Sequence, residues 1–216
     1  MELESLNWTL VIDTFLLLLI GIGPKIALVP FLEATKQMPQ ATQRRVLRKM
    51  LTTAATVALL LLILGGLLTR LLHFSPGALG VASGAILFII AVTMVLGRSD
   101  SNHDNSPSAE DSDPMRIAVF PLAVPYLLNP AGIVVLVTTS AEAASVGVFA
   151  VVLGILILVL ALDVVVFRWA VQVSSHLDAS RMLVTEKVFG FLLAALGVQL
   201  ALSGLADVGA IHLTGH

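Results

Sequence analysis

In two short motifs within apolar sequence, a proline directly follows glycine or asparagine: Gly23-Pro24-Lys25 and Asn129-Pro130-Ala131-Gly132. Asparagine is a strong helix N-cap, and proline suits the first helical position, where its missing N–H is not needed. Each motif therefore predicts a helix that begins within the apolar stretch. A helix N-terminus presents free N–H groups and about half a positive charge, which suits a carboxylate. Alternatively, both prolines merely kink packed helices.

Few ionisable residues lie within the apolar stretches, and such residues are functional candidates because they are costly in lipid. Asp13 and Asp163 could each carry a coupling proton, or each could be an interfacial carboxylate that water reaches. Lys25 could attract the carboxylate of a substrate, or it could pair with Asp13 or Asp163 as a structural element.

Histidine and cysteine, which many enzymes use, are missing from the apolar stretches. Cysteine is absent, which excludes disulfides and thiolate metal sites. HExxH, Walker A and GxSxG motifs do not occur. We therefore expect no enzyme activity, no cofactor and no metal site. The five histidines all fall in loops or at chain ends: His73, His103, His176, His212 and His216.

The composition indicates a membrane protein. Hydrophobic residues make up 57% of the 216 residues and charged residues 12%, against about 25% charged residues in soluble domains. So few charges cannot cover a water-facing surface, so we expect the lipid bilayer to cover most of it. No basic face is available to neutralise phosphates, so nucleic acid is not an expected partner.

Continuous apolar runs predict an all-α membrane protein with six transmembrane helices, because transmembrane strands would instead alternate with a period of two. The first and fourth segments carry several glycines and prolines, so both are predicted to be broken. The six segments are 7–35, 52–72, 77–97, 117–140, 146–171 and 188–208.

Residues 98–115 differ in kind, because they are acidic, rich in serine and asparagine, and almost free of apolar side chains. We interpret them as a flexible cytoplasmic linker between the two halves, 1–97 and 116–216. Most lysines and arginines lie on one side of the predicted spans, and the positive-inside rule makes that side cytoplasmic. Both termini are then outside; if the first segment is a re-entrant hairpin, the N-terminus is inside.

The halves resemble each other at a constant offset. The shift that places Pro24 over Pro130 also places Gly84 over Gly190 and Thr93 over Gln199. Three spans per half would make the second half an inverted copy, an architecture of transporters with a site near the midplane. Chance similarity between apolar sequences is the alternative. Thr93 and Gln199 could line the cavity or could join helices.

Three stretches resemble the MarC family of inner-membrane proteins, which belongs with the LysE-type exporters: IGPKIALVPFLEAT, VFPLAVPYLLNPAGI and VFGFLLAALGVQLALSGL. In this chain the Asn-Pro-x-Gly motif lies in the second half, whereas the family usually has it in the first. The resemblance implies transport of small neutral amino acids such as glycine or alanine, driven by a proton gradient, at the inner (plasma) membrane.

The leading hypothesis is thus a secondary transporter that binds its substrate between residues 23–25 and 129–132. An ion or metal exporter is one alternative, although it would need clustered Asp, Glu or His ligands. A non-transporting membrane scaffold is the other. The sequence leaves the oligomeric state open.

Overall fold

The computed structural model describes residues 8–96, 113–142, 146–173 and 179–212. Apart from one isolated β-bridge, the regular secondary structure of these residues is helical, as the sequence predicts. The elements are α1 (Trp8–Gly21), α2 (Pro24–Thr35), α3 (Gln40–Leu72), α4 (Pro76–Leu96), α5 (Pro114–Ile117), η1 (Ala118–Leu127), α6 (Pro130–Glu142), α7 (Val146–Val173) and α8 (Ala179–Asp207).

Four helices in the described residues are long and apolar enough to cross a membrane. They are Gln40–Leu72, Pro76–Leu96, Val146–Gln172 within α7 and Gly190–Asp207 within α8. The other two predicted spans, 7–35 and 117–140, each consist of shorter helices instead. The chain is therefore a multi-pass membrane protein in which two segments are interrupted.

Each interruption lies directly before the proline that begins the next helix, because the proline ring disfavours the helical region for the residue that precedes it. Gly23, before Pro24, has φ −153° and ψ 158°. Leu128, which follows η1 and lies two residues before Pro130, is also extended, with φ −91° and ψ 92°. Phe120 and Val124, before prolines inside η1, are extended as well, with φ −136° and −133°. Pro30, by contrast, lies inside α2 without ending it, so the predicted break of the first segment lies at Ile22 and Gly23 alone.

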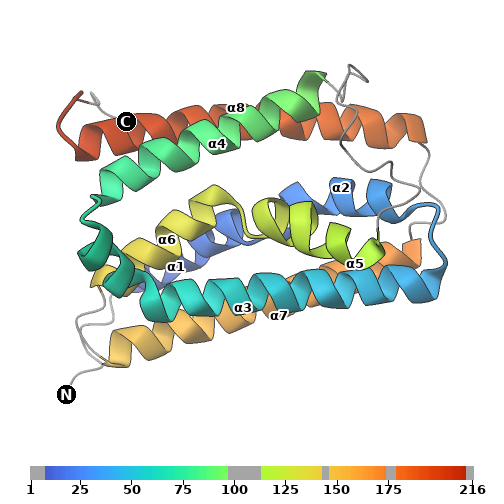
Figure 1. The fold of residues 1–216 in the computed structure, drawn as a ribbon, viewed down its shortest axis with the longest axis horizontal. Helices are drawn as coiled ribbons and strands as arrows, with labels where there is room; N and C mark the ends of the chain where they lie inside the picture. Colours follow the sequence, from blue (N-terminus) through green and yellow to red (C-terminus); the bar gives the residue numbers. More distant parts are fainter. Residues whose placement is uncertain (1–7, 97–112, 143–145, 174–178, 213–216) are drawn as a thin grey trace.

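The interrupted segments form a central layer between two helix pairs, α4–α8 and α3–α7 (Figure 1). Within that layer the two segments run in opposite directions, so that α1 packs against α6 and α2 against η1. The largest buried hydrophobic cluster joins the central layer to α3 and α7. The middle of each interrupted segment is therefore enclosed by protein.

The predicted connections differ from the structure at two places. α3 begins at Gln40, so the basic residues expected between the first two spans (Arg44, Arg45, Arg48 and Lys49) lie on a helix. Most of the predicted acidic linker, namely 98–112 of 98–115, lies outside the described residues. Its last part is helical, because Asp113 caps α5 by accepting a hydrogen bond from the Met115 N–H at 3.0 Å.

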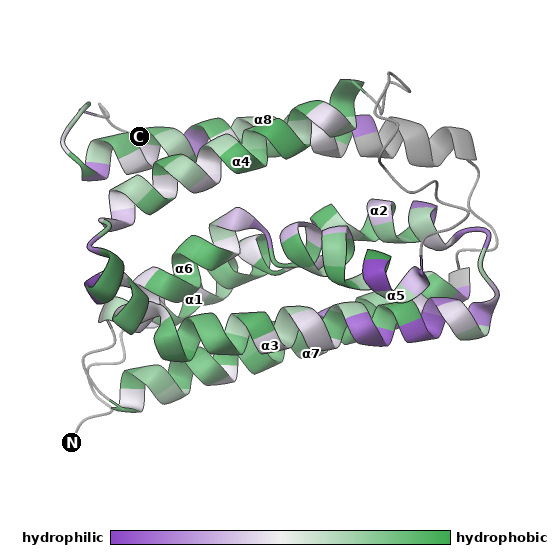
Figure 2. Ribbon diagram, in the orientation of Figure 1, coloured by the Kyte–Doolittle hydropathy of each residue, from purple (hydrophilic) through white to green (hydrophobic). Residues whose placement is uncertain are grey.

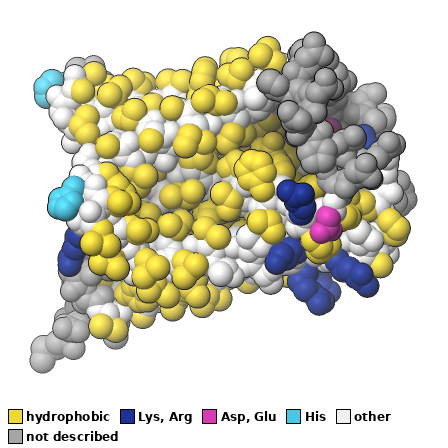
Figure 3. Space-filling model, in the orientation of Figure 1, with side chains coloured by type: hydrophobic (Ala, Val, Ile, Leu, Met, Phe, Trp, Pro, Cys, Tyr) yellow, Lys and Arg dark blue, Asp and Glu magenta, His cyan; other side chains and the backbone are white. Residues whose placement is uncertain are grey.

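The surface distribution of side chains agrees with a bilayer environment. Hydrophobic residues cover the helices along most of their length (Figure 2), and many are exposed, such as Ile89 at 62% and Leu64 at 41%. Lysines and arginines gather at one end of the molecule, around the start of α3 (Figure 3). An apolar belt with a basic end is typical of a protein in lipid.

Glycine lets α4 and α8 approach each other closely, as is common between membrane helices. A Cβ atom at Gly84 would lie 2.6 Å from the backbone nitrogen of Ala201, and one at Gly204 would lie 2.6 Å from that of Val81. Neither contact could be relieved by a side-chain rotation, so these glycines determine the spacing of the α4–α8 pair.

Replacement of Gly84 by alanine should therefore destabilise the protein by about 1–3 kcal/mol, because the added methyl group overpacks the α4–α8 contact. Thermal unfolding in one detergent measures the effect. Gly154→Ala is the matched control, since a Cβ at Gly154 on α7 would meet nothing within 4 Å and alanine favours helix. Equal unfolding temperatures for the two variants would contradict the close α4–α8 contact.

Candidate functional site

The two interruptions meet each other at the centre of the molecule. Ile22 and Leu128 form an antiparallel β-bridge, and the N–H of Asn129 donates to the carbonyl of Gly21 at 3.0 Å. Backbone groups released from helical hydrogen bonding must find partners inside a bilayer. Here each interrupted segment supplies such partners for the other.

The contact between the two interrupted segments is called the crossing below. The Asn129 side chain stabilises it with two hydrogen bonds. Its Nδ2 donates to the carbonyl of Ile20 at 2.8 Å, and its Oδ1 accepts from the N–H of Gly132 at 3.1 Å. The second bond is the helix cap that the sequence predicts at the start of α6. Asn129 is fully buried, and both of its polar side-chain atoms are occupied, so it positions α6 and joins it to α1.

Gly21 and Gly132 allow the crossing to be this tight. A Cβ atom at Gly21 would collide with the Cα of Gly132, and one at Gly132 would collide with the carbonyl oxygen of Gly21. Gly132 belongs to the predicted site, whereas Gly21 was read from the sequence only as part of a break. No local signal distinguishes its role, because the contact joins residues that lie in different halves of the chain.

The start of α2 differs from that of α6. Gly23 provides no side-chain cap, and Pro24 occupies the first turn. The N–H groups of Lys25 and Ile26 therefore have no partner within the helix. Gly23 and Ile26 are buried, whereas the Lys25 side chain is exposed on the isolated chain. The α2 start thus combines free backbone donors with a nearby ammonium group, and it is the better place for an anion.

The two carboxylates proposed from the sequence lie in unlike surroundings. Asp13 is exposed on α1. Asp163 on α7 is fully buried, and neither of its oxygens has a hydrogen-bond partner among the residues that the structure describes. One turn further along α7, Phe167 packs edge-on against Phe31 of α2, with ring centroids 5.4 Å apart. Asp163 therefore lies in the apolar contact region that joins α7 to the central layer.

Thr93 and Gln199 are not joined to the crossing by any hydrogen bond of the described residues. Thr93 Oγ1 donates to the carbonyl of Ile90 at 2.7 Å, and Gln199 Nε2 reaches Ser203 Oγ at 3.5 Å. The first bond lies within α4 and the second within α8, and both side chains are exposed on the isolated chain.

Apolar residues instead connect the α4–α8 pair to the start of α2. Ile26 is buried in a small cluster with Leu87, Ala91 and Met94 of α4 and Leu193 of α8. The sequence carries no signal of this contact, because the five residues look like any others in an apolar run. This cluster packs the start of α2 against the α4–α8 pair.

Comparisons with known proteins agree with this membrane fold. A family model described as "MarC family integral membrane protein" matches residues 8–208. The UPF0056 membrane protein YvbG of Bacillus subtilis is 28% identical over 193 residues, covering 87% of this chain and 90% of the relative. The UPF0056 membrane protein MJ1677 of Methanocaldococcus jannaschii is 25% identical, covering 85% and 90%.

A third relative, a UPF0056 membrane protein of Archaeoglobus fulgidus, is 24% identical and covers 90% of this chain and 91% of its own length. No solved structure matches the chain. The similarity therefore extends over nearly whole chains and includes both interrupted segments.

The role of Asn129 at the crossing predicts a graded loss of stability. Serine can still cap α6 but cannot reach Ile20, whereas alanine leaves both the Ile20 carbonyl and the Gly132 N–H unpaired in a buried site. The unfolding temperature should fall in the order wild type, Asn129→Ser, Asn129→Ala, and the alanine variant should lose about 1–3 kcal/mol.

Gln199→Ala is the control, because the exposed Gln199 makes only the long contact within α8. An Asn129→Ala variant as stable as Gln199→Ala would show that the crossing does not depend on the asparagine.

Proposed function

We propose that this chain, which belongs to the MarC family of integral membrane proteins, is a secondary transporter of small neutral amino acids. The observation that carries the proposal is the crossing of the two interrupted segments, which brings the buried starts of α2 and α6 together within the apolar part of the molecule. The choice of small neutral amino acids rests on the family resemblance.

An inverted repeat is part of the proposal, and two pairs of element boundaries support it. The offset in sequence between the starts of α2 and α6 is the same as that between the ends of α1 and η1. The bridge at the crossing joins Ile22 to Leu128, which are related by this same offset. A residue that pairs with its own counterpart lies on the axis relating the two halves, as a site between inverted repeats requires.

The proposed site uses the unequal starts of the two inner helices. The free N–H groups of Lys25 and Ile26 would hold the substrate carboxylate, and the Lys25 ammonium group would strengthen this interaction. Both polar side-chain atoms of Asn129 are already hydrogen-bonded to the backbone at the crossing, so we assign it to positioning α6 and not to direct binding.

We propose Asp163 as the residue that carries a coupling proton. An ionised carboxylate without partners is costly in an apolar interior, and Asp163 is such a residue among the described side chains. Gain and loss of its proton would change the polarity of the contact between α7 and α2, which is where one half would move against the other.

We further propose that the protein resides in the inner membrane with its basic end in the cytoplasm. Figure 1 supports the predicted arrangement of the termini, because α1 begins and α8 ends at the end of the molecule opposite the start of α3.

Proteoliposome uptake tests the site. Labelled glycine and alanine should enter faster with a pH gradient than without one, and Lys25→Met should raise the half-saturating concentration roughly ten-fold, because a charge-assisted contact is lost. Lys36→Met, at the exposed far end of α2, is the matched control. Uptake of neither amino acid into sealed vesicles would refute this substrate class. Unchanged saturation in Lys25→Met would remove Lys25 from the site.

Comparing two asparagine variants tests the coupling carboxylate. Asp163→Asn should lose gradient-driven accumulation while it retains exchange of labelled for unlabelled substrate, because binding and movement do not need the proton. Asp13→Asn should accumulate substrate like the wild type, since Asp13 is exposed. The reverse result would assign the proton to Asp13, and intact accumulation in both variants would argue against either residue as the carrier.

A further inference from the structure

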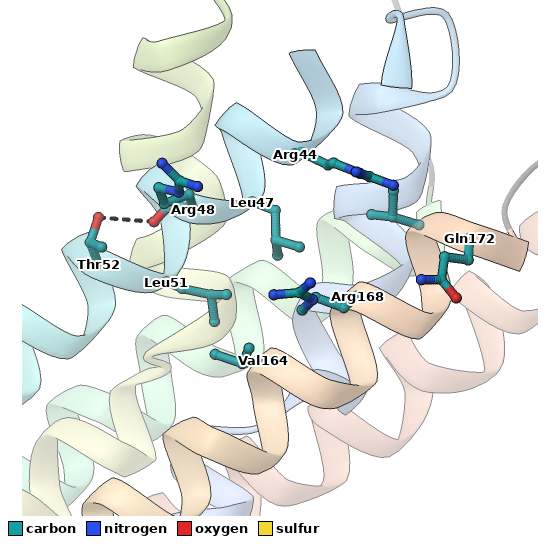
Figure 4. Close-up of a pocket in the computed structure, with 9 residues that line it drawn as sticks. Arg44, Leu47, Arg48, Leu51, Thr52, Val164, Arg168 and Gln172 are labelled. Atoms are coloured by element: carbon teal, nitrogen blue, oxygen red, sulfur yellow. Dashed lines mark hydrogen bonds between the residues drawn. The ribbon is translucent and has the colours of Figure 1, made fainter. Parts of the chain in front are cut away.

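A second site lies away from the crossing, in a cavity between α3 and α7 with a volume of about 360 Å³. Small-molecule sites commonly have volumes of about 300–1,000 Å³. Arginines from both helices line the cavity, namely Arg44 and Arg48 of α3 and Arg168 of α7. Figure 4 shows Arg168 reaching from α7 toward α3, and Arg44 reaching from α3 toward the part of α7 that carries Gln172.

The charge of this cavity is not balanced by the described part of the protein. No aspartate or glutamate lines it, and the described residues contain no salt bridge to any of the three arginines. Three positively charged side chains that line one cavity make it a favourable place for an anion. Guanidinium groups bind phosphate oxygens in pairs of parallel hydrogen bonds, which makes phosphate the best-matched anion.

The cavity also has an apolar wall. Leu51 and Val164 line it together with the arginines, and Thr52 and Gln172 add polar groups. A ligand that fills the cavity must therefore carry both a negative charge and apolar groups. An anionic phospholipid has this character, whereas a free phosphate ion would leave the apolar wall without a partner.

The position of the cavity along the helices agrees with the level of lipid headgroups. α3 has 33 residues, or roughly 50 Å at 1.5 Å per residue, which exceeds a hydrocarbon core of about 30 Å. Its basic first turns can thus extend beyond the core. Trp169, next to Arg168, is 66% exposed, and tryptophan favours the membrane interface.

We propose that this cavity binds the phosphate group of an anionic membrane lipid and thereby joins α3 to α7. Basic pockets between transmembrane helices are suited to such headgroups. The positive-inside rule alone would not require a cavity, since it depends only on the number of charges. Arg45 and Lys49 lie exposed on the same turns of α3 but do not line the cavity. Substituting them therefore distinguishes lipid binding in the cavity from a general charge bias.

Native mass spectrometry and thermal unfolding of the full chain in detergent test this proposal, with phosphatidylglycerol and phosphatidylcholine as probes. The wild type should retain phosphatidylglycerol and gain thermal stability from it, because a ligand that binds the folded state stabilises it. Arg48→Gln and Arg168→Gln should each weaken this binding roughly ten-fold, and the combined variant should lose it.

Arg45→Gln and Lys49→Gln are the controls, and they should retain the lipid as the wild type does. Equal loss in the control and cavity variants, or full retention in the combined variant, would overturn the proposal. Inorganic phosphate is tested separately: stabilisation by phosphate alone, without a response to phosphatidylglycerol, would assign the cavity to a soluble phosphate compound and overturn the lipid assignment.

Discussion

Backbone polar groups cannot remain unpaired in the hydrocarbon core of a bilayer, and the crossing of the two interrupted segments satisfies this constraint without continuous helix. Each break releases N–H and carbonyl groups in the middle of its segment. The bridge between Ile22 and Leu128 and the hydrogen bonds of Asn129 take up several of them. Gly21 and Gly132 make this possible, because any side chain there would hold the two backbones apart.

The same hydrogen bonds give the first turns of α2 and α6 different capping. Asn129 closes the start of α6, while Gly23 leaves the start of α2 without a side-chain cap. A half-helix start with open donors is the feature that an anionic group can use. The asymmetry is therefore chemical and not only geometric, and it directs the proposed substrate carboxylate to the first half of the chain.

The two outer helix pairs are built on different principles. α4 and α8 approach through glycines, which suits close and extensive contact in lipid. α7 meets the central layer through larger side chains, including the Phe31–Phe167 contact near the unpartnered Asp163. The α3–α7 side also holds the arginine-lined cavity. Asp163 and the arginine-lined cavity thus both lie on the α3–α7 side of the proposed site.

Hydrophobicity, charge count and the Gly/Pro motifs by themselves determined that the chain is helical and lies in a membrane. They also determined that it is interrupted where α2 and α6 begin. These properties depend on local backbone preference and on transfer from water to lipid, so the sequence alone contains them. The capping role of Asn129 was also readable from its neighbours. Only the tertiary structure decided that both polar side-chain atoms of Asn129 are hydrogen-bonded and that Gly21 touches Gly132. It also decided that Asp163 is buried while Asp13 is exposed, and that arginines of α3 and α7 share one cavity. Each of these facts depends on which helix faces meet across long sequence separations, and an apolar run carries no local signal of its facing residues.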